Sequence, residues 1–351
     1  MNIKKGRAII DIESDPFGES ASIVAHKTMQ LMGGRFQFES ASRQLMRLVD
    51  HAYRGLPPHR FSRNSPSFRV RLMLTPAPPR PAEKKSAARR RSEPPPISML
   101  HGPDVLGAAT ESSTFVLLSP QHRTALVSIA PAMLAFPYHT RYELLEFAVF
   151  TLASRAQQLV PLHAACVGID GRGILLMGAT GAGKTTVALH CLLNGFEFLS
   201  EDSVFVLPTT MHATGTSNFL HVRADSLRWL EKSRNRILIQ KSPVIQRRSG
   251  VTKFEVDLRR KQFRLAPAPL KIEAVAFLTA TSGRPRSLLR SMTQSEMLGK
   301  ITALQGYGAR LPQWRSFSRK LENIKALEVR RGDHPMEAVQ ALRSLLINGT
   351  G

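Results

Sequence analysis

Cysteine is scarce in this sequence, and its scarcity excludes several classes of protein. The chain of 351 residues contains two cysteines, Cys166 and Cys191, and both lie within apolar runs. Two isolated thiols provide neither a disulfide framework nor the paired spacing of a structural zinc site. We therefore expect buried, reduced thiols and a cytoplasmic protein.

Long hydrophobic runs are also missing. No stretch of about 18 consecutive residues is apolar, so the sequence predicts no membrane insertion. The basic start, residues 1–7, is followed by Asp11, Glu13 and Asp15, where a signal peptide would have an apolar core. Hydrophobic residues nevertheless make up 42% of the chain, which is enough for a sizeable folded core.

Acidic residues are few in comparison with basic ones. The chain has 26 Asp and Glu against 49 Lys and Arg, which gives a net charge of +23. Such a charge attracts nucleotide phosphates, nucleic acid, acidic peptides and membrane surfaces alike. Because the sequence contains no helix-turn-helix, zinc-finger or aromatic ribonucleoprotein pattern, we expect no sequence-specific binding of nucleic acid.

A basic, proline-rich segment divides the chain. Residues 76–103 are predicted to be a linker or long loop, with a docking tail for an anionic partner as the alternative. Residues 1–75 are predicted to form a small α+β N-terminal region, with a helix over 41–53 and a strand over 68–75. Residues 104–348 are predicted to form an α/β catalytic domain with a mixed sheet, in which residues 217–270 are hard to assign.

The most specific motif lies in the second half of the chain. Residues 178–185 read GATGAGKT and match the phosphate-binding pattern G-x-x-x-x-G-K-[ST] without a mismatch. The apolar run 173–177 predicts a strand before the motif, and residues 186–194 predict a helix that stops at Gly195. This strand–loop–helix context is the one that the motif requires. The alternative is a chance glycine-rich turn or a decayed loop.

The residue types of this loop suit a polyphosphate. Glycines let the backbone turn its N–H groups inward, and the helix N-terminus adds a partial positive charge. Lys184 would neutralise the β- and γ-phosphates, and the Thr185 hydroxyl would hold Mg²⁺. We predict that the nucleotide is bound by Gly178, Ala179, Thr180, Gly181, Ala182, Gly183, Lys184, Thr185 and Thr186.

Further polar residues accompany the loop. His163 begins a predicted strand over 162–169, whose hairpin partner leads into the loop. Glu201 and Asp202 end the strand that follows the loop helix, where carboxylates can hold Mg²⁺ or accept a proton. Lys253 lies in a segment of alternating polar and apolar residues. A histidine of the core and a turn or helix cap are the alternative explanations for His163 and for the two carboxylates.

From His163 to Asp202 the sequence resembles the catalytic core of HPr kinase/phosphorylase. In that family a histidine precedes a hairpin, the hairpin enters the phosphate loop, the helix ends in glycine, and two carboxylates close the next strand. The positions that match the family's spacing without a gap are His163, Gly178, Gly183, Lys184, Thr185, Gly195 and Asp202. The resemblance extends weakly over 140–348 and does not include the N-terminal half.

The resemblance implies a P-loop mixed β-sheet kinase domain of HPr-kinase type that uses ATP and Mg²⁺. Asp202 would be the base that takes a proton from an acceptor serine hydroxyl, and His163 would tune or share that proton. Lys184, together with Mg²⁺ on Thr185, would offset the charge on the transferred group. Glu201 would help to hold the metal.

A second set of implied features is less specific to the family. Lys253 resembles a downstream basic position and is a candidate phosphate contact. Relatives form symmetric assemblies, so a homo-oligomer is expected as one option. ATP and GTP both stay open, because the sequence contains no evident base-reading motif.

The chain departs from the HPr enzyme at the loop and at the carboxylates. Glu201 stands where the family usually has aspartate, and Ala179 and Thr180 stand where its loop often carries an acidic residue or serine. These departures favour the HPr-kinase-like proteins associated with peptide modification, including lasso-peptide kinases. We therefore predict an ATP-dependent serine kinase that acts on a protein or peptide, and the basic charge suits an acidic one.

Three other functions remain open from the sequence. The chain could be a nucleotide-binding switch or scaffold without phosphotransfer, a nucleic-acid-stimulated ATPase, or a kinase of small molecules. The phosphate loop does not distinguish them, since it reports the nucleotide and says nothing of the acceptor.

Overall fold

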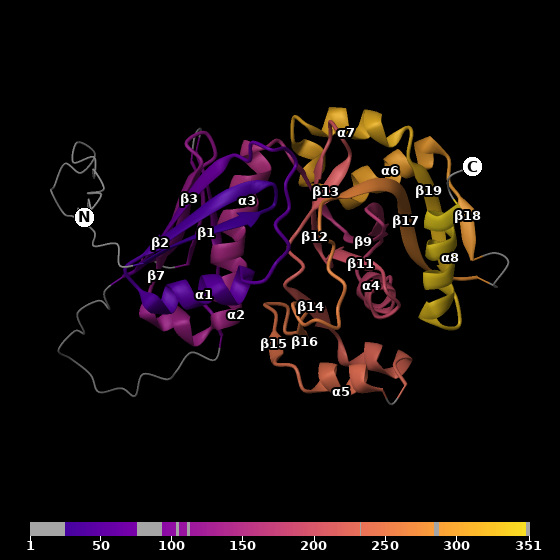
Figure 1. The fold of residues 1–351 in the computed structure, drawn as a ribbon, viewed down its shortest axis with the longest axis horizontal. Coiled ribbons are helices and arrows are strands. Elements are labelled where there is room, and N and C mark those ends of the chain that lie inside the picture. Colours follow the sequence, from indigo (N-terminus) through magenta and orange to yellow (C-terminus); the bar gives the residue numbers. More distant parts are fainter. Residues whose placement is uncertain are drawn as a thin grey trace, which may run out of the picture.

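The computed structural model describes residues 25–75, 93–102, 105–110, 113–231, 233–283 and 288–348. These residues form two units that lie side by side (Figure 1). Most of the predicted linker, residues 76–92 and 103, falls outside the described residues, as do residues 1–24.

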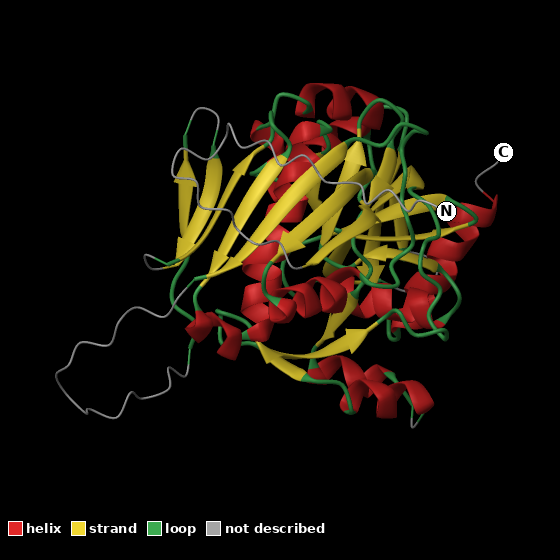
Figure 2. Cartoon of the chain, turned by 60° about the vertical axis from the view of Figure 1, so that its left-hand side comes forward, coloured by secondary structure: helices red, strands yellow, loops and turns green. Residues whose placement is uncertain are grey.

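A seven-stranded sheet of order β1-β2-β3-β7-β6-β5-β4 forms the first unit. Helices α1 (Arg43–Tyr53) and α3 (Phe147–Ala156) pack on one face of it and share its apolar core (Figure 2). Burial alternates along β3, as the period of a half-covered strand requires. The strands are β1 (Ala25–Leu31), β2 (Gly34–Ser40), β3 (Ser67–Leu74), β4 (Ser98–His101), β5 (Leu106–Thr110), β6 (Thr114–Ser119) and β7 (Thr124–Ile129).

This sheet corrects the predicted domain boundary. Strand β7 pairs in parallel with β3, with Val70 opposite Ala125, so residues 106–129 belong to the first unit and not to a domain beginning at residue 104. Strand β4, inside the predicted linker, pairs with β5. The proline-rich segment was a misleading signal because it connects two strands of one sheet, a pairing that local sequence patterns do not reveal.

A long helical segment over residues 140–156 also belongs to this unit. It begins as a π-helical segment η3 (Thr140–Glu146) and continues as α3, and both pack on the first core. Two short helical segments precede it, η2 (Pro131–Ala135) and α2 (Pro137–His139). The second unit therefore begins at β8 (Val160–His163).

The second unit contains a nine-stranded sheet of order β11-β9-β10-β17-β13-β12-β8, with β19 and β18 beyond β17. Strand β17 pairs in parallel with β10 and β19, whereas its neighbours are otherwise antiparallel, so the predicted mixed sheet is confirmed. The strands are β9 (Ala165–Ile169), β10 (Arg172–Met177), β11 (Glu197–Ser200), β12 (Ser203–Leu207), β13 (His212–Thr214), β17 (Leu270–Ser282), β18 (Leu289–Ser291) and β19 (Lys325–Arg331).

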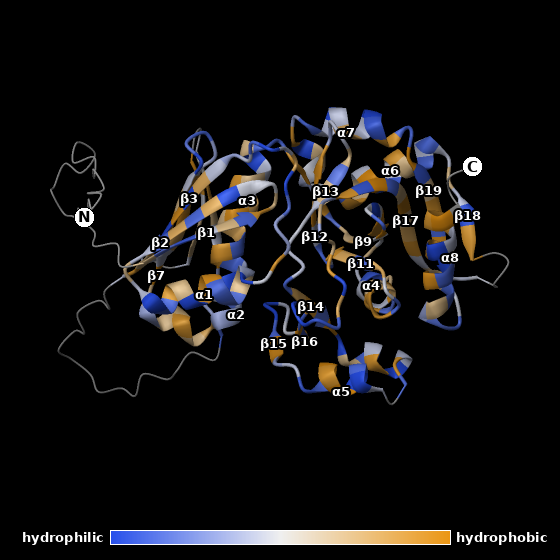
Figure 3. Ribbon diagram, in the orientation of Figure 1, coloured by the Kyte–Doolittle hydropathy of each residue, from blue (hydrophilic) through white to orange (hydrophobic). Residues whose placement is uncertain are grey.

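Helices cover both faces of this sheet. Helices α4 (Lys184–Leu193) and α8 (Pro335–Asn348) share one core with it, and α6 (Gln294–Leu304) and α7 (Trp314–Leu321) share the other. Hydrophobic residues concentrate where these helices meet the strands (Figure 3). The two free cysteines lie in these cores, and burial raises the pKa of both thiols, which confirms the prediction of buried thiols.

Residues 217–270, which the sequence left unassigned, build a small third sheet of order β14-β16-β15. Its strands are β14 (Phe219–Val222), β15 (Val244–Gln246) and β16 (Thr252–Asp257), and between β14 and β15 lie η4 (Ala224–Trp229) and α5 (Arg234–Gln240). The chain also bends at Ala164, so the single strand predicted over 162–169 is two strands. Strand β8 pairs with β12, whereas β9 pairs with β10 and β11.

Polar contacts fix the two units against each other. The imidazole of His59 contacts the hydroxyl of Thr214 at 2.8 Å and the carbonyl oxygen of Ala266 at 2.9 Å. Arg259 donates to the carbonyl oxygen of His51 at 2.6 Å.

Among the described residues, no helix is long and apolar enough to cross a membrane.

Candidate functional site

The glycine-rich loop links the buried end of β10 to the first turn of α4. Gly178 and Gly183 have φ angles of 151° and 97°, in the region that favours glycine, and Gly183 is the N-cap of α4. A Cβ on Gly178 would lie 2.6 Å from the carbonyl oxygen of Leu278 in β17. The loop therefore needs glycine for both conformation and space, and it places the N-terminus of α4 beside the sheet edge.

The side chain of Lys184 folds back over this loop. Its Nζ donates to the carbonyl oxygen of Gly178 at 2.7 Å and lies 3.4 Å from that of Ala179. Burial lowers the pKa of Lys184, while the nearby charge of Asp202 raises it. The ammonium group is thus held at the loop itself, where a bound phosphate would meet it.

Thr185 and Glu201 lie together next to the loop. The Thr185 hydroxyl donates to Glu201 Oε1 at 3.3 Å, and the Nζ atom of Lys253 lies 3.9 Å from the same oxygen. The backbone N–H of His221 donates to Glu201 Oε2 at 2.5 Å. The predicted residues Thr185, Glu201 and Lys253 are therefore brought together, and the sequence had given no sign of His221.

A hydroxyl beside a carboxylate is a donor pair that fits Mg²⁺. Magnesium in nucleotide sites is usually held by one or two protein oxygens, with phosphate oxygens and water completing its shell. Thr185 and Glu201 would supply those protein oxygens. Within the described parts of the chain, no group of three or more acidic, histidine or cysteine side chains could hold a metal.

Asp202 and His163 form a direct pair. Strands β8 and β12 are antiparallel with His163 opposite Ser203, so the imidazole lies against the adjacent carboxylate, with Nδ1 2.7 Å from Asp202 Oδ1. Arg247 approaches the other oxygen, with Nη1 3.5 Å from Oδ2. Burial acts against ionisation of Asp202, but the hydrogen bond from His163 and the charges of His163, Arg247 and Lys253 outweigh it and hold the pKa of that carboxyl far below its usual range.

Gln305 positions His163 from the far side. Its side-chain oxygen accepts from the backbone N–H of His163 at 2.7 Å, and its nitrogen donates to the backbone carbonyl of the same residue at 3.2 Å. Together with Tyr307, these residues border a cavity of ≈ 260 Å³ that also reaches Asp202. The imidazole is 57% exposed on its side chain, so the His163–Asp202 pair faces an open space on this side.

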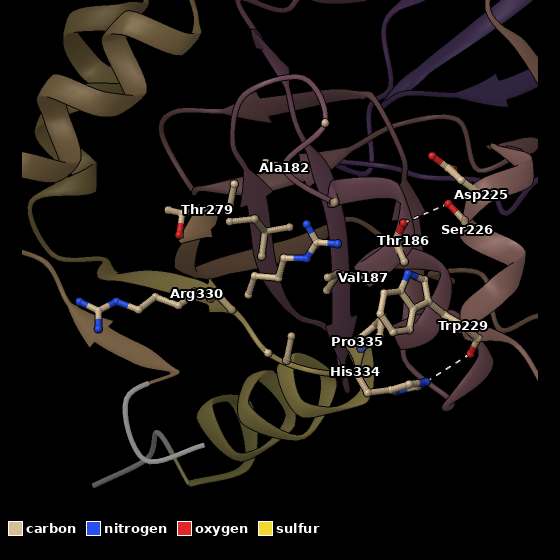
Figure 4. A pocket seen from close by; sticks show the side chains of 18 of the residues that line it. Ala182, Thr186, Val187, Asp225, Ser226, Trp229, Thr279, Arg330, His334 and Pro335 are labelled. Atoms are coloured by element: carbon tan, nitrogen blue, oxygen red, sulfur yellow. Dashed lines mark hydrogen bonds between the residues drawn. The ribbon is translucent and has the colours of Figure 1, made fainter. Parts of the chain in front are cut away.

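A second cavity, of ≈ 160 Å³, begins at the phosphate loop and runs between η4 and the start of α8 (Figure 4). The Thr186 hydroxyl lies 3.1 Å from that of Ser226, which ties η4 to the first turn of α4. The rings of Trp229 and His334 meet edge to face, with centroids 5.5 Å apart. An aromatic wall beside a phosphate loop suits the base of a nucleotide, since rings stack favourably on a base.

A buried chain of polar side chains leads from Glu201 into the first unit. The His221 ring lies 3.4 Å from Glu201 Oε2 and 3.3 Å from Glu255 Oε1, and Glu255 accepts from Arg141 of η3 at 2.5 Å. Arg141 also lies 3.3 Å from Glu146. Burial acts to lower the pKa of His221, but the hydrogen bonds and charges of the two carboxylates raise it above its ordinary value.

The structure brings together the side chains to which the sequence assigned chemistry: His163, Lys184, Thr185, Glu201, Asp202 and Lys253. Sequence reasoning missed His221, Arg247, Glu255, Arg141 and Gln305. They come from segments far apart in the chain, and no local motif marks them.

Comparison with known proteins gives little beyond this geometry. No family model matches the chain, and no curated protein matches it. Among solved structures, the chain is similar to the structure of the Hpr(Ser) kinase/phosphatase from Coxiella burnetii, at 12% identity and a TM-score of 0.26, over 54% of this chain and 99% of that chain. The roles proposed below therefore rest on the residues and contacts of the site.

Proposed function

We propose that the chain is an ATP-dependent, Mg²⁺-requiring kinase that transfers the γ-phosphoryl group to a serine hydroxyl of a protein or peptide. The observation that carries this proposal is the His163–Asp202 pair, which borders an open cavity and stands one residue from the carboxylate beside Thr185. Binding a nucleotide requires the loop and Thr185. A proton acceptor beside a second cavity suits an acceptor hydroxyl that must lose its proton.

The proposed step is an in-line displacement. The acceptor oxygen bonds to the γ-phosphorus as its proton passes to Asp202, and the bond from that phosphorus to the β,γ-bridging oxygen breaks to release ADP. The low pKa keeps Asp202 ionised at neutral pH, and the Nδ1–H of His163 orients it and shares the incoming proton. Lys184 would offset the negative charge of the β- and γ-phosphates, and Mg²⁺ on Thr185 and Glu201 would add to that effect.

A nucleotide-dependent switch is the second candidate, and one observation favours it. The buried chain from Glu201 through His221 and Glu255 to Arg141 connects the phosphate loop to the first unit. A switch would use that connection to report the bound nucleotide to a partner. It would hydrolyse nucleotide without labelling an acceptor.

Nucleotide binding can be measured with the protein's own fluorescence, because the chain has only two tryptophans. In the Trp314→Phe variant, Trp229 is the sole indole, and we expect ATP to change its emission because it lines the cavity beside the loop. Adding Lys184→Ala is expected to weaken ATP binding about tenfold or more, since a charge-assisted contact contributes about 1.5–3 kcal/mol. Lys241→Ala, an exposed lysine of the same unit, is the matched control. Equal ATP affinity with and without Lys184 would show that this loop does not hold the nucleotide.

A further inference from the structure

A large cavity lies between the two units, away from the phosphate loop. Its volume is ≈ 740 Å³. The first unit contributes one wall from α1 and from the segment that runs through η2 and α2, and the second unit contributes β15 and the turn after it. The apolar lining includes Leu48, Leu134, Phe136, Tyr138, Val244 and Ile245.

Basic side chains outnumber acidic ones around this cavity. Arg47, Arg141, Arg247 and Arg248 line it with His51 and His139, against Glu93 and Glu255. Three of the four arginines have carboxylate partners, since Arg141 binds Glu255 at 2.5 Å, Arg248 binds Glu143 at 2.7 Å and Arg247 lies 3.5 Å from Asp202. Arg47 has no carboxylate partner among the described residues, and its charge favours an acidic occupant.

Arg247 has hydrogen-bonding capacity that the described residues do not use. Its Nη1 lies near Asp202, but its Nε and Nη2 atoms are buried with no hydrogen-bond partner in the part of the chain that the structure describes. Unpaired buried donors are rare in folded proteins because they cost about 1–3 kcal/mol each. Arg247 also lines the small space beside Asp202, so it joins the large cavity to the catalytic carboxylate.

Strand β15 is an edge strand of the third sheet, and the side that no strand pairs with borders this cavity. The carbonyl of Pro243 accepts from Glu255 and the N–H of Arg247 donates to Val251, so alternate residues of β15 face β16. The backbone groups of Val244 and Gln246 then point the other way. The carbonyl of Gln246 already accepts from His139 at 3.1 Å, so it is not available to a docked strand, whereas Val244 beside it is 63% exposed.

We propose that this cavity docks an extended, acidic segment of the kinase's protein or peptide substrate, which adds as a strand to the edge of β15. An unpaired edge strand binds an extended segment through backbone hydrogen bonds, and the pockets beside it select alternate side chains. Here the apolar lining takes one face of the segment, and Arg47 takes its carboxylates. This inference rests on the proposed function in one respect: if the chain is a kinase, the docked segment is held next to Asp202.

The edge can be tested by removing one N–H group. In Val244→Pro, the missing N–H is the one that points away from β16, so the strand pairing of the fold is kept. The probe is a fluorescein-labelled peptide of alternating Glu and Val with a central Ser, measured by fluorescence anisotropy, and its Lys-for-Glu counterpart is the negative control. We expect the acidic peptide to bind the wild type and to bind Val244→Pro about tenfold more weakly. The substitution removes one backbone hydrogen bond to the peptide and disturbs the adjacent one.

Matched variants separate this result from other effects. Val244→Ala keeps the N–H and is expected to bind nearly as the wild type does, and Arg47→Glu is expected to weaken binding of the acidic peptide. Thermal unfolding of Val244→Pro reports whether the fold is kept. Equal binding of both peptides, or equal binding by Val244→Pro and Val244→Ala, would overturn the docking site.

Failure of the kinase proposal would look different. Lys184→Ala is expected to bind the acidic peptide with unchanged affinity, since the phosphate loop is not part of this cavity. Peptide binding without ATP binding in the wild type would refute the kinase and leave the docking site standing. ATP binding without peptide binding would refute only the docking site.

Discussion

Asp202→Asn is expected to lower phosphoryl transfer about 100- to 10,000-fold, the range that a positioned proton acceptor contributes. The amide keeps the size of the carboxylate but cannot accept the hydroxyl proton, and it no longer carries the charge that pairs with His163 and Arg247. ATP binding is expected to stay close to that of the wild type, because no contact joins Asp202 to the loop backbone in the described residues. Single-turnover transfer of labelled phosphate, measured at saturating ATP, isolates the chemical step.

A matched control exists in the hairpin before the loop. Asp170→Asn changes an exposed aspartate at a turn position with a φ of 50°, a conformation that asparagine tolerates well. It is expected to leave transfer unchanged. Full transfer by Asp202→Asn with intact ATP binding would show that another group takes the proton, and His163→Gln would then be the next variant to compare.

Arg141→Met is expected to lower the free energy of unfolding by about 3 kcal/mol or more, because it leaves buried carboxylates without their cation. Arg141 is 1% exposed and contacts both Glu255 and Glu146. Denaturant unfolding of the full chain measures the change. Arg141→Lys keeps a charge but loses the two-pronged geometry, so its stability is expected to lie between those of the wild type and Arg141→Met.

Arg141→Met is also expected to weaken the binding of Mg²⁺. Arg141 pairs with Glu255, Glu255 contacts His221, and His221 contacts Glu201. Without the Arg141 cation, Glu201, the carboxylate proposed to hold Mg²⁺, loses the support of these contacts. Loss of such outer support typically costs about 10- to 100-fold in metal affinity. The measurement is the Mg²⁺ concentration that gives half-maximal ATP affinity.

Arg259→Met is the control that distinguishes loss of support for the proposed Mg²⁺ site from a general weakening of the contact between the two units. Arg259 also connects the two units, since it donates to the carbonyl oxygen of His51 and its guanidinium lies 4.8 Å from the centroid of the Phe219 ring. Among the described residues it has no contact with Glu255, His221 or Glu201. It is expected to lower stability without changing the Mg²⁺ requirement. An equal shift in both variants would mean that Arg141 acts only through the packing of the units.

Local features were readable from the sequence because the residues that make them are neighbours in the chain. The pattern 173–195 predicted a strand, a glycine loop and a helix, and β10, the loop and α4 follow one another as expected. The resemblance from His163 to Asp202 also implied a histidine near a carboxylate, and the structure places the two side chains in contact. Antiparallel pairing of β8 with β12 supplies the physical reason.

Features that depend on distant segments could not be predicted. The parallel pairing of β3 with β7 joins residues on either side of a proline-rich segment that looks like a linker, and this misplaced the domain boundary. Arg141 and Glu255 are 114 residues apart in the sequence, and each alone is an ordinary charged residue. Their burial together is decided by the docking of the two units, which no periodicity reports.

The most direct test of the central claim follows the γ-phosphorus itself. Purified protein with Mg²⁺ and lysate from its own source is supplied with ATP labelled at the γ- or the α-phosphorus, and compared with Lys184→Ala and Asp202→Asn. We predict a protein or peptide that carries label at serine from γ-labelled ATP alone and loses it with either variant. Release of labelled phosphate with no labelled acceptor would contradict the kinase and favour the nucleotide-dependent switch.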